Sequence, residues 1–283
     1  MHLIIDSGST KASWGLLEGK EHKTTVNTAG LNPYFHTSES ISAILRAELL
    51  PYIVTDHIRE IHFYGAGCST ENNDELISGS LRNFFHQARI FVYHDILGAA
   101  RALFGNDRGI SCILGTGCNC CFYDGSGIIS KVDSLGYLFG DEGAGSYLGK
   151  NLMADYLKRR LPADLREEFE GKYRLSLEDI LNSLYNLPYP NRFLASFSEF
   201  LAQHQEHPYV YNLVKNSFHA FFEAQVKHYE GYQELPVSFV GSIAFHYRKI
   251  LEEAAKAEKI HIGTVIKAPM EGLMRFHGEM VRW

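Results

Sequence analysis

Two short turns built from small residues are the first candidates for phosphate chemistry. One contains Ser7-Gly8-Ser9-Thr10 and the other contains Gly115-Thr116-Gly117, and each follows a short apolar run. Such turns present several backbone N–H groups to one side and let an anion approach without meeting a side chain. Each turn taken alone is equally consistent with a plain hairpin turn. Neither has the spacing of a Walker loop or of a dinucleotide fingerprint, so those two classes of nucleotide site are disfavoured.

Acidic residues adjoin these apolar runs and glycines. Asp6 ends the first run, where a carboxylate could face a metal-bound nucleotide or could simply initiate a turn. Asp95 ends a predicted strand and precedes a predicted helix, so a helix N-cap is the alternative to a catalytic role. Asp141 and Glu142 lie among the three glycines of the segment 140–145. That composition favours a ligand loop over a solvated turn.

The elements that must position these residues alternate between strands and helices. The segment 2–20 predicts a β-hairpin, because two apolar runs flank a glycine turn. Apolar residues at helical spacing predict helices over 38–50 and 72–86. Strands are predicted at 61–67 and 90–93. This alternation indicates a layered α/β sheet.

The same order of elements begins again about a hundred residues later. Ile110–Leu114, the turn at Gly115 and Cys120–Tyr123 repeat the pattern of strand, glycine turn and strand. Strand–turn–strand patterns are common, so the repeat alone leaves coincidence and a functional pairing both open. A polar turn at Asp107 just before the repeat is the predicted domain boundary.

The C-terminal half is predicted to be mainly helical. From Gly149 onward the chain is rich in aromatic residues at helical spacing, which we interpret as core. Ser176 and Asp179 resemble a capping box at the start of one helix. A late strand is predicted at 237–240, followed by a helix over 243–255.

Composition limits the possible function classes. The chain has 283 residues, with 27 Lys plus Arg against 33 Asp plus Glu, and its formal net charge is −6. Such a chain does not bind nucleic acid by bulk charge, so any phosphate must be bound locally. The apolar start of the chain is too short for a signal peptide, and no stretch reaches the length of a membrane span. We therefore expect a cytoplasmic protein without a membrane partner.

Four of the five cysteines, Cys112, Cys118, Cys120 and Cys121, crowd into ten residues. This crowding does not resemble a disulfide framework. Alternation along a strand would send Cys118 and Cys120 to one face and Cys121 to the other, so buried thiols are favoured over a metal or iron–sulfur site. The 14 histidines are scattered without a zinc motif and are interpreted as surface or core residues.

Taken in order, these motifs resemble the acetate and sugar kinase, Hsp70 and actin superfamily. More closely, they resemble the N-acetylglucosamine kinase branch of the BadF/BadG ATPase family. The resemblance covers most of the chain and is weakest over 159–233. It is carried by Asp6-Ser7-Gly8-Ser9-Thr10, Asp95 with Gly98-Ala99, Gly115-Thr116-Gly117-Cys118-Asn119-Cys120, Gly140-Asp141-Glu142-Gly143 and Val240-Gly241-Ser242.

The resemblance implies an α/β fold of two ribonuclease H-like (actin-like ATPase) domains with a central nucleotide cleft. Residues 1–107 would form the first domain, with a C-terminal helix over about 270–283 packing back on it, and residues 108–269 the second. By the same resemblance Asp95 would be the catalytic base and Asp6 would hold Mg²⁺. The implied ATP-binding residues are Ser7, Gly8, Ser9, Thr10, Gly115, Thr116, Gly117, Gly241 and Ser242. The implied sugar-binding residues are Asn32, Asp95, Thr116, Asn119 and Asp141.

The activity implied is that of an ATP-dependent kinase acting on a hydroxyl of an amino sugar, N-acetylglucosamine above all. Two alternatives stay open: an ATPase that activates a partner enzyme, and a non-catalytic sugar or nucleotide sensor. The partner expected is a small-molecule sugar, and a homodimer is left open. Asp133-Ser134 stands where the family pattern has paired glycines, which would reshape the acceptor pocket.

Overall fold

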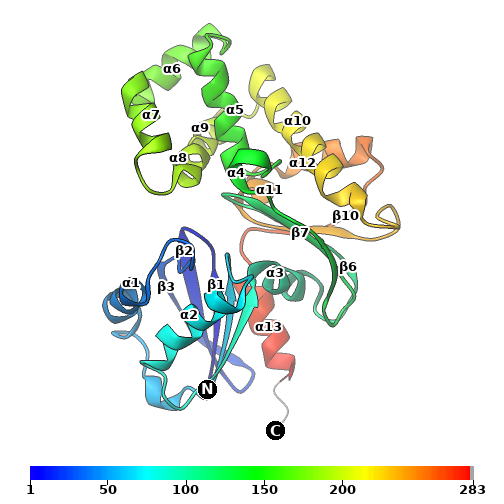
Figure 1. Ribbon diagram of the computed structural model, residues 1–283. Helices are drawn as coiled ribbons and strands as arrows, with labels where there is room; N and C mark the ends of the chain where they lie inside the picture. Colours follow the sequence, from blue (N-terminus) through cyan, green and yellow to red (C-terminus); the bar gives the residue numbers. More distant parts are fainter. Residues whose placement is uncertain (281–283) are drawn as a thin grey trace. The chain divides into compact units, whose positions relative to one another are not determined.

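The computed structural model describes residues 1–280 and divides into two compact units (Figure 1). The first unit comprises Met1–Arg108, the short segment Tyr123–Ile128 and the C-terminal segment from Ala268. The second comprises Gly109–Phe122 and Ile129–Lys267. Each unit is built around one five-stranded sheet with helices packed against it.

The sheet of the first unit has the strand order β3-β2-β1-β4-β5. β1 and β2 are antiparallel, as are β2 and β3, whereas β4 and β5 run parallel to β1. Ser7 pairs with Gly65, which in turn pairs with His94, so the carboxyl ends of the three parallel strands lie in one row. The bounds are β1 His2–Ser7, β2 Lys11–Glu18, β3 Glu21–Ala29, β4 Glu60–Gly65 and β5 Arg89–His94.

Helices cover both faces of this sheet, which explains why β1 is apolar at successive positions. Leu3 and Ile5 point into a core formed with α1 and α2, whereas Ile4 points into a core formed with α13. All three side chains are fully buried. The helices of this unit are α1 Ser38–Ile44, which continues as the π-helix η1 Leu45–Leu49, the 3₁₀-helix η2 Thr55–His57, α2 Glu71–Arg82, α3 Asp95–Phe104 and α13 Met270–Met280.

The predicted terminal helix is observed as α13, and residues 281–283 of that prediction lie outside the described residues. α13 packs against α3, β1 and β2. His277 on this helix is buried, and its Nε2 lies 2.8 Å from Tyr64 Oη, which also accepts a hydrogen bond from Arg101 Nη1 at 2.7 Å. The tyrosine oxygen accepts from Arg101, and its own hydrogen remains available to donate to a neutral imidazole.

This buried imidazole makes the first unit sensitive to acid. Burial, with the nearby charges of His62 and Arg101, lowers the pKa of His277 to about 2. The unfolded chain takes up this proton near pH 6.5 and the folded chain does not, so stability present above pH 6.5 is lost as the pH falls toward 2. From pH 7 to pH 5 the free energy of unfolding should fall by about 2 kcal/mol more in the wild type than in His277→Gln, measured by denaturant titration. Equal losses in the two proteins would contradict this account.

The sheet of the second unit has the order β10-β9-β6-β7-β8. When the strands of each sheet are numbered 1 to 5 in chain order, the first sheet has the order 3-2-1-4-5. The second has the order 5-4-1-2-3, which is the same order reversed. In both sheets, strands 4 and 5 run parallel to strand 1. The predicted α/β fold class is confirmed. The bounds are β6 Gly109–Leu114, β7 Cys118–Tyr123, β8 Ile128–Val132, β9 Val237–Val240 and β10 Ile262–Ile266.

The second unit is mainly helical between β8 and β9, as predicted. The predicted stripe that includes Phe197 and Phe200 lies in the core, whereas Tyr185 is 81% exposed. The capping box of Ser176 and Asp179 begins α7. The helices are α4 Gly136–Phe139, α5 Gly145–Leu157, α6 Ala163–Tyr173, α7 Leu177–Tyr185, α8 Pro190–Ser196, α9 Ser198–Gln203, α10 Pro208–Ala224, the 3₁₀-helix η3 Val226–His228, α11 Ser242–His246 and α12 Arg248–Ala257. Within residues 1–280, no helix combines the length and hydropathy needed to cross a membrane.

Three local predictions differ from the structure. The helix predicted over 38–50 passes from α-helix into the π-helix η1. The helix predicted over 243–255 is interrupted at Tyr247, whose ring is buried and whose hydroxyl donates to the Ser198 carbonyl at 2.8 Å. Strands β3, β8 and β10 were not predicted, because few of their side chains are buried: Thr28 in β3, none in β8 and Val265 in β10.

Candidate functional site

The glycine turn of the first unit connects β1 to β2 at the carboxyl end of β1. Gly8 N–H donates to the Lys11 carbonyl at 3.0 Å, which closes the turn. The loop after β3 is fitted against it, because Ser7 Oγ accepts from Leu31 N–H at 2.9 Å. A Cβ at Gly30 would lie 2.2 Å from the Gly8 carbonyl oxygen, so only glycine fits there. Thr10 is exposed and available to a ligand.

Asn32 is held rigidly beside this turn. Its Nδ2 donates to Ser9 Oγ at 3.0 Å, and its Oδ1 accepts from Tyr34 N–H at 3.0 Å. Only 6% of Asn32 is exposed. Gly67, in the loop after β4, has φ +84°, and a Cβ there would lie 2.5 Å from Asn32 Oδ1. The predicted sugar-binding asparagine is therefore packed between two loops at the carboxyl end of the sheet.

Two predicted carboxylates lie at the same edge. Asp6 is in β1, and Asp95 is the first residue of α3, immediately after β5. Burial and the charge of Asp95 raise the pKa of Asp6 to about 7, although Lys11 opposes the shift. Asp95 Oδ1 lies 2.6 Å from His94 Nδ1. Two carboxylates that repel one another offer oxygen ligands of the kind that Mg²⁺ prefers, so the residues present fit a magnesium ion.

Two further residues at this edge were not singled out by sequence reasoning. Burial raises the pKa of Asp74 on α2, and its Oδ1 is buried with no hydrogen-bond partner among residues 1–280. Burial, with the charges of Asp74 and Asp95, raises the pKa of the Cys68 thiol. Neither residue belongs to a recognisable motif. Cys68 lies in the loop after β4, and Asp74 lies on α2, which packs beside β5.

The glycine turn of the second unit connects β6 to β7, and the start of α5 supports it. Gly115 N–H donates to the Gly117 carbonyl at 3.0 Å within the turn. Gly145 N–H donates to the Gly115 carbonyl at 2.9 Å, and Ser146 N–H donates to the Thr116 carbonyl at 2.9 Å. The turn carbonyls therefore point to the N-terminus of a helix.

Asp141 braces this turn from the loop before α5. Its Oδ1 accepts from Cys118 N–H and its Oδ2 accepts from Ser146 Oγ, both at 3.0 Å. Ser134 Oγ lies 3.5 Å from the same Oδ1. Only 5% of Asp141 is exposed, its φ is +61°, and burial raises the pKa of its carboxyl group. Both carboxylate oxygens thus already accept hydrogen bonds from the chain itself.

The remaining predicted residues of the second unit lie near the same turn. Gly241 has φ +129°, and a Cβ there would lie 2.2 Å from the Leu114 carbonyl oxygen, so the loop after β9 closely approaches the end of β6. Ser242 begins α11. Asn119 on β7 is buried, and its Oδ1 accepts from Cys120 N–H at 3.0 Å.

The structure therefore gathers the predicted residues into two groups, one in each unit. The group of the first unit consists of Asp6, Ser7, Gly8, Ser9, Thr10, Asn32 and Asp95, and that of the second of Gly115, Thr116, Gly117, Asn119, Asp141, Gly241 and Ser242. Each group lies at the carboxyl end of the parallel strands of its own sheet. All five cysteines are buried and none forms a disulfide bond, and burial was predicted for the four between Cys112 and Cys121.

No protein-family model matches the chain, and no curated protein sequence matches it. Among solved structures, one from Porphyromonas gingivalis, described as a "putative N-acetylglucosamine kinase", is 43% identical. The match covers 99% of both chains with a TM-score of 0.94. The chain belongs to this family of sugar kinases. The family has the two-domain actin-like ATPase fold.

Two more distant structures share that fold with the kinase. A second "putative N-acetylglucosamine kinase", from Chromobacterium violaceum, is 15% identical, with a TM-score of 0.73 over 97% of this chain and 98% of that chain. A ROK family glucokinase from Streptomyces griseus, solved with glucose and AMPPNP, is 11% identical, with a TM-score of 0.54 over 99% of both chains. At these identities the likeness concerns the fold alone.

Proposed function

We propose that this kinase transfers the γ-phosphoryl group of ATP to a hydroxyl of an amino sugar, with N-acetylglucosamine as the acceptor. The observation that carries the proposal is the 43% identity, over 99% of the chain, to the Porphyromonas gingivalis protein. Membership of the BadF/BadG branch, a cytoplasmic location and a homodimer stay predictions.

Asp95 is the proposed general base. Phosphoryl transfer requires a correctly placed acceptor hydroxyl and charge stabilisation, with little covalent participation by the protein. The Asp95 carboxylate would accept the proton of the sugar hydroxyl as that oxygen attacks the γ-phosphorus. His94, 2.6 Å away, fixes the orientation of the carboxylate.

The two glycine turns are the proposed phosphate-binding elements. Backbone N–H groups of small-residue turns bind anions, and the exposed hydroxyl of Thr10 adds a donor in the first unit. Asp6 would hold Mg²⁺, which when bound neutralises charge on the phosphates. Gly241 and Ser242 would lie near the adenosine.

The proposed sugar-binding residues differ in how freely they can reach a ligand. Asn32 is only 6% exposed, but its bonds to Ser9 and Tyr34 use one of its two amide hydrogens and one of the two lone pairs of Oδ1, so it keeps further hydrogen-bonding capacity. Asp141 would act mainly by holding the turn 115–117 in shape, because its oxygens accept hydrogen bonds from Cys118 and Ser146.

A coupled assay of ADP release over N-acetylated, free amino and plain hexoses tests the proposed function. We expect ADP release that depends on N-acetylglucosamine, with a sugar phosphate ester visible by phosphorus NMR. ADP release without any sugar phosphate would favour a partner-activating ATPase. ATP binding without turnover would favour a sensor. Either of these results would overturn the proposal.

Gly67→Ala is expected to raise the KM for the sugar roughly tenfold with a smaller effect on kcat. The new Cβ would lie 2.5 Å from Asn32 Oδ1 and would displace that side chain. Steady-state kinetics with the sugar as the varied substrate measures the effect.

Gly105→Ala is the matched control for this substitution. Gly105 also has a positive φ, +59°, but no atom lies within 4 Å of the position that a Cβ would take there. Like Gly67→Ala, it therefore places a Cβ at a positive φ, which strains the backbone, but without the contact to Asn32. An equal rise in KM in both variants would mean that strain, rather than the position of Asn32, controls sugar binding.

A further inference from the structure

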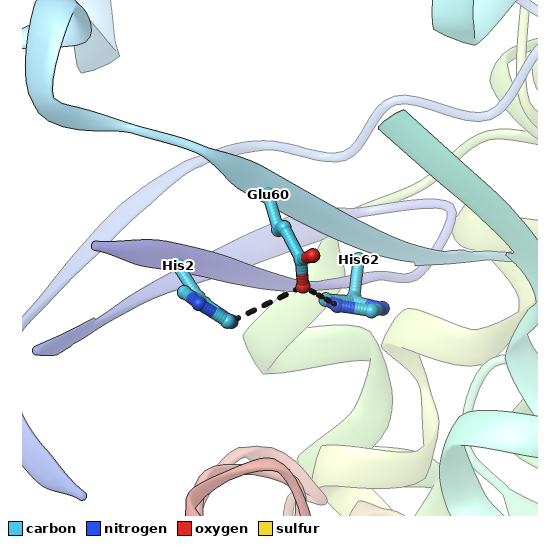
Figure 2. A group of neighbouring side chains, drawn as sticks. All are labelled: His2, Glu60 and His62. Atoms are coloured by element: carbon cyan, nitrogen blue, oxygen red, sulfur yellow. Dashed lines mark hydrogen bonds and ion pairs between the residues drawn. The ribbon is translucent and has the colours of Figure 1, made fainter. Parts of the chain in front are cut away.

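Three residues at the amino end of the first sheet form a cluster that the kinase function does not use. His2 begins β1, and Glu60 and His62 lie on β4 (Figure 2). The parallel register pairs His2 with Glu60, and His62 is two residues further along the same strand. Side chains two residues apart on a strand share a face, so all three project to one side of the sheet.

Figure 2 shows both imidazole rings directed at the Glu60 carboxylate. His2 Nδ1 and His62 Nε2 each lie 3.4 Å from Glu60 Oε2, and the three ligand atoms all lie within 4.8 Å of one another. A tetrahedral zinc ion with ligands at about 2.1 Å holds its ligand atoms about 3.4 Å apart. A hydrogen bond from an imidazole N–H is usually shorter, at about 2.7 to 3.2 Å. The hydrogen bond between His62 and Glu60 is therefore long, and both imidazole–carboxylate spacings match those around a shared ion.

The surrounding contacts leave these three atoms available. Arg89 donates to the other carboxylate oxygen, Glu60 Oε1, and so leaves Oε2 for the imidazoles. The ring of His62 stacks on Phe91 with centroids 5.0 Å apart, which fixes its orientation. Its Nδ1 is buried and has no hydrogen-bond partner in the part of the chain that the structure describes, so Nε2 is the nitrogen that faces the cluster.

The cluster is also in a suitable protonation state and within reach of solvent. Burial lowers the pKa of both His2 and His62, which favours the neutral imidazole that a metal requires. The side chains of His2, Glu60 and His62 retain exposures of 26%, 20% and 13%. An ion could therefore enter from water and keep a water molecule as its fourth ligand.

We propose that His2, Glu60 and His62 bind one divalent transition-metal ion, of the zinc class. Two imidazole nitrogens and one carboxylate oxygen favour such an ion over magnesium. The site is separate from the proposed magnesium site, because His2 and Asp6 lie at opposite ends of β1, roughly 13 Å apart at the rise of a strand. A metal here would join the starts of β1 and β4.

The test is a Zn²⁺ titration of the chelator-treated full chain by calorimetry, in millimolar Mg²⁺ to occupy the sites that prefer oxygen ligands. We expect one Zn²⁺ per chain in the wild type. His2→Gln and Glu60→Gln should each weaken this binding roughly tenfold or more, because each removes one of three ligands. A second titration with Co²⁺ should show the visible absorption of a nitrogen-ligated ion, and this absorption should be lost in both variants.

His86→Gln is the matched control, because this exposed histidine lies in the same unit outside the cluster. It should bind Zn²⁺ as the wild type does. Circular dichroism of the metal-free variants checks that they are folded. The proposal is wrong if the folded wild type shows no saturable Zn²⁺ binding, or if His2→Gln and Glu60→Gln bind as tightly as His86→Gln. Neither result depends on whether the protein is a sugar kinase.

Discussion

Replacing Asp95 with asparagine is expected to reduce kcat by roughly a hundredfold or more, while the dissociation constant of ATP changes little. Asparagine is close in shape to aspartate but cannot accept the proton of the sugar hydroxyl. Asp95 begins α3 directly after β5, where the row of strand ends also places Ser7 and Gly65. Steady-state kinetics at saturating sugar, with equilibrium binding of ATP to the same preparation, measures both quantities.

The matched control for this variant is Asp56→Asn. Asp56 is an exposed aspartate of the 3₁₀-helix η2 in the same unit, away from the carboxyl ends of the parallel strands. This control should retain the kcat of the wild type. Full activity in Asp95→Asn would remove Asp95 from the mechanism. A parallel loss of ATP binding would assign it a structural part in the nucleotide site instead of the role of base.

The repeated strand and turn pattern could be recognised from sequence because it is local. Each hairpin is formed by one continuous segment, and the alternation of apolar strands and glycine turns predicts both of them. The order of strands in the complete sheets is not local, because it depends on where strands from later in the chain pair with the hairpins. β4 and β5 add to β1, just as β9 and β10 add to β6.

The elements that were missed depend on tertiary contacts. The helix predicted over 243–255 is interrupted at Tyr247, whose hydroxyl donates to the Ser198 carbonyl, 49 residues away in the chain. The π-helix η1 continues α1 without a change in apolar spacing, and Leu45 and Leu49 within it are both buried. Periodicity cannot distinguish these outcomes from one continuous helix.

In the candidate site too, the residues that tertiary contacts bring together were missed. The glycines and Asp95 occur in recognisable motifs, whereas Asp74 comes to the site through the packing of α2. The histidines were interpreted as surface or core residues, because no pair has the spacing of a zinc motif within one element. His2 and His62 meet through the parallel pairing of β1 with β4, and residues 58 to 60 positions apart carry no local signal.

Asp6→Asn is expected to change activity and stability in opposite directions. In the kinase reaction the neutral amide would no longer supply the charge proposed to hold Mg²⁺, and kcat should fall roughly a hundredfold or more. In the free protein the same substitution removes a carboxylate that burial and Asp95 hold in an unfavourable ionised state, with a pKa of about 7. The variant should therefore be the more stable protein at pH 8, by on the order of 4 kcal/mol.

The pH dependence of this gain separates electrostatic strain from better packing. The folded chain keeps the Asp6 proton up to about pH 7 whereas the unfolded chain releases it near pH 4, so the wild type loses stability as the pH rises through that window. The advantage of Asp6→Asn should shrink steadily from pH 8 to pH 5 in chelator, measured by denaturant titration, and Asp56→Asn should show no such trend. A gain that is constant with pH would come from packing. No gain at pH 8 would mean that the fold does not destabilise the ionised Asp6 carboxylate. There would then be no repulsion between Asp6 and Asp95 for a bound cation to relieve.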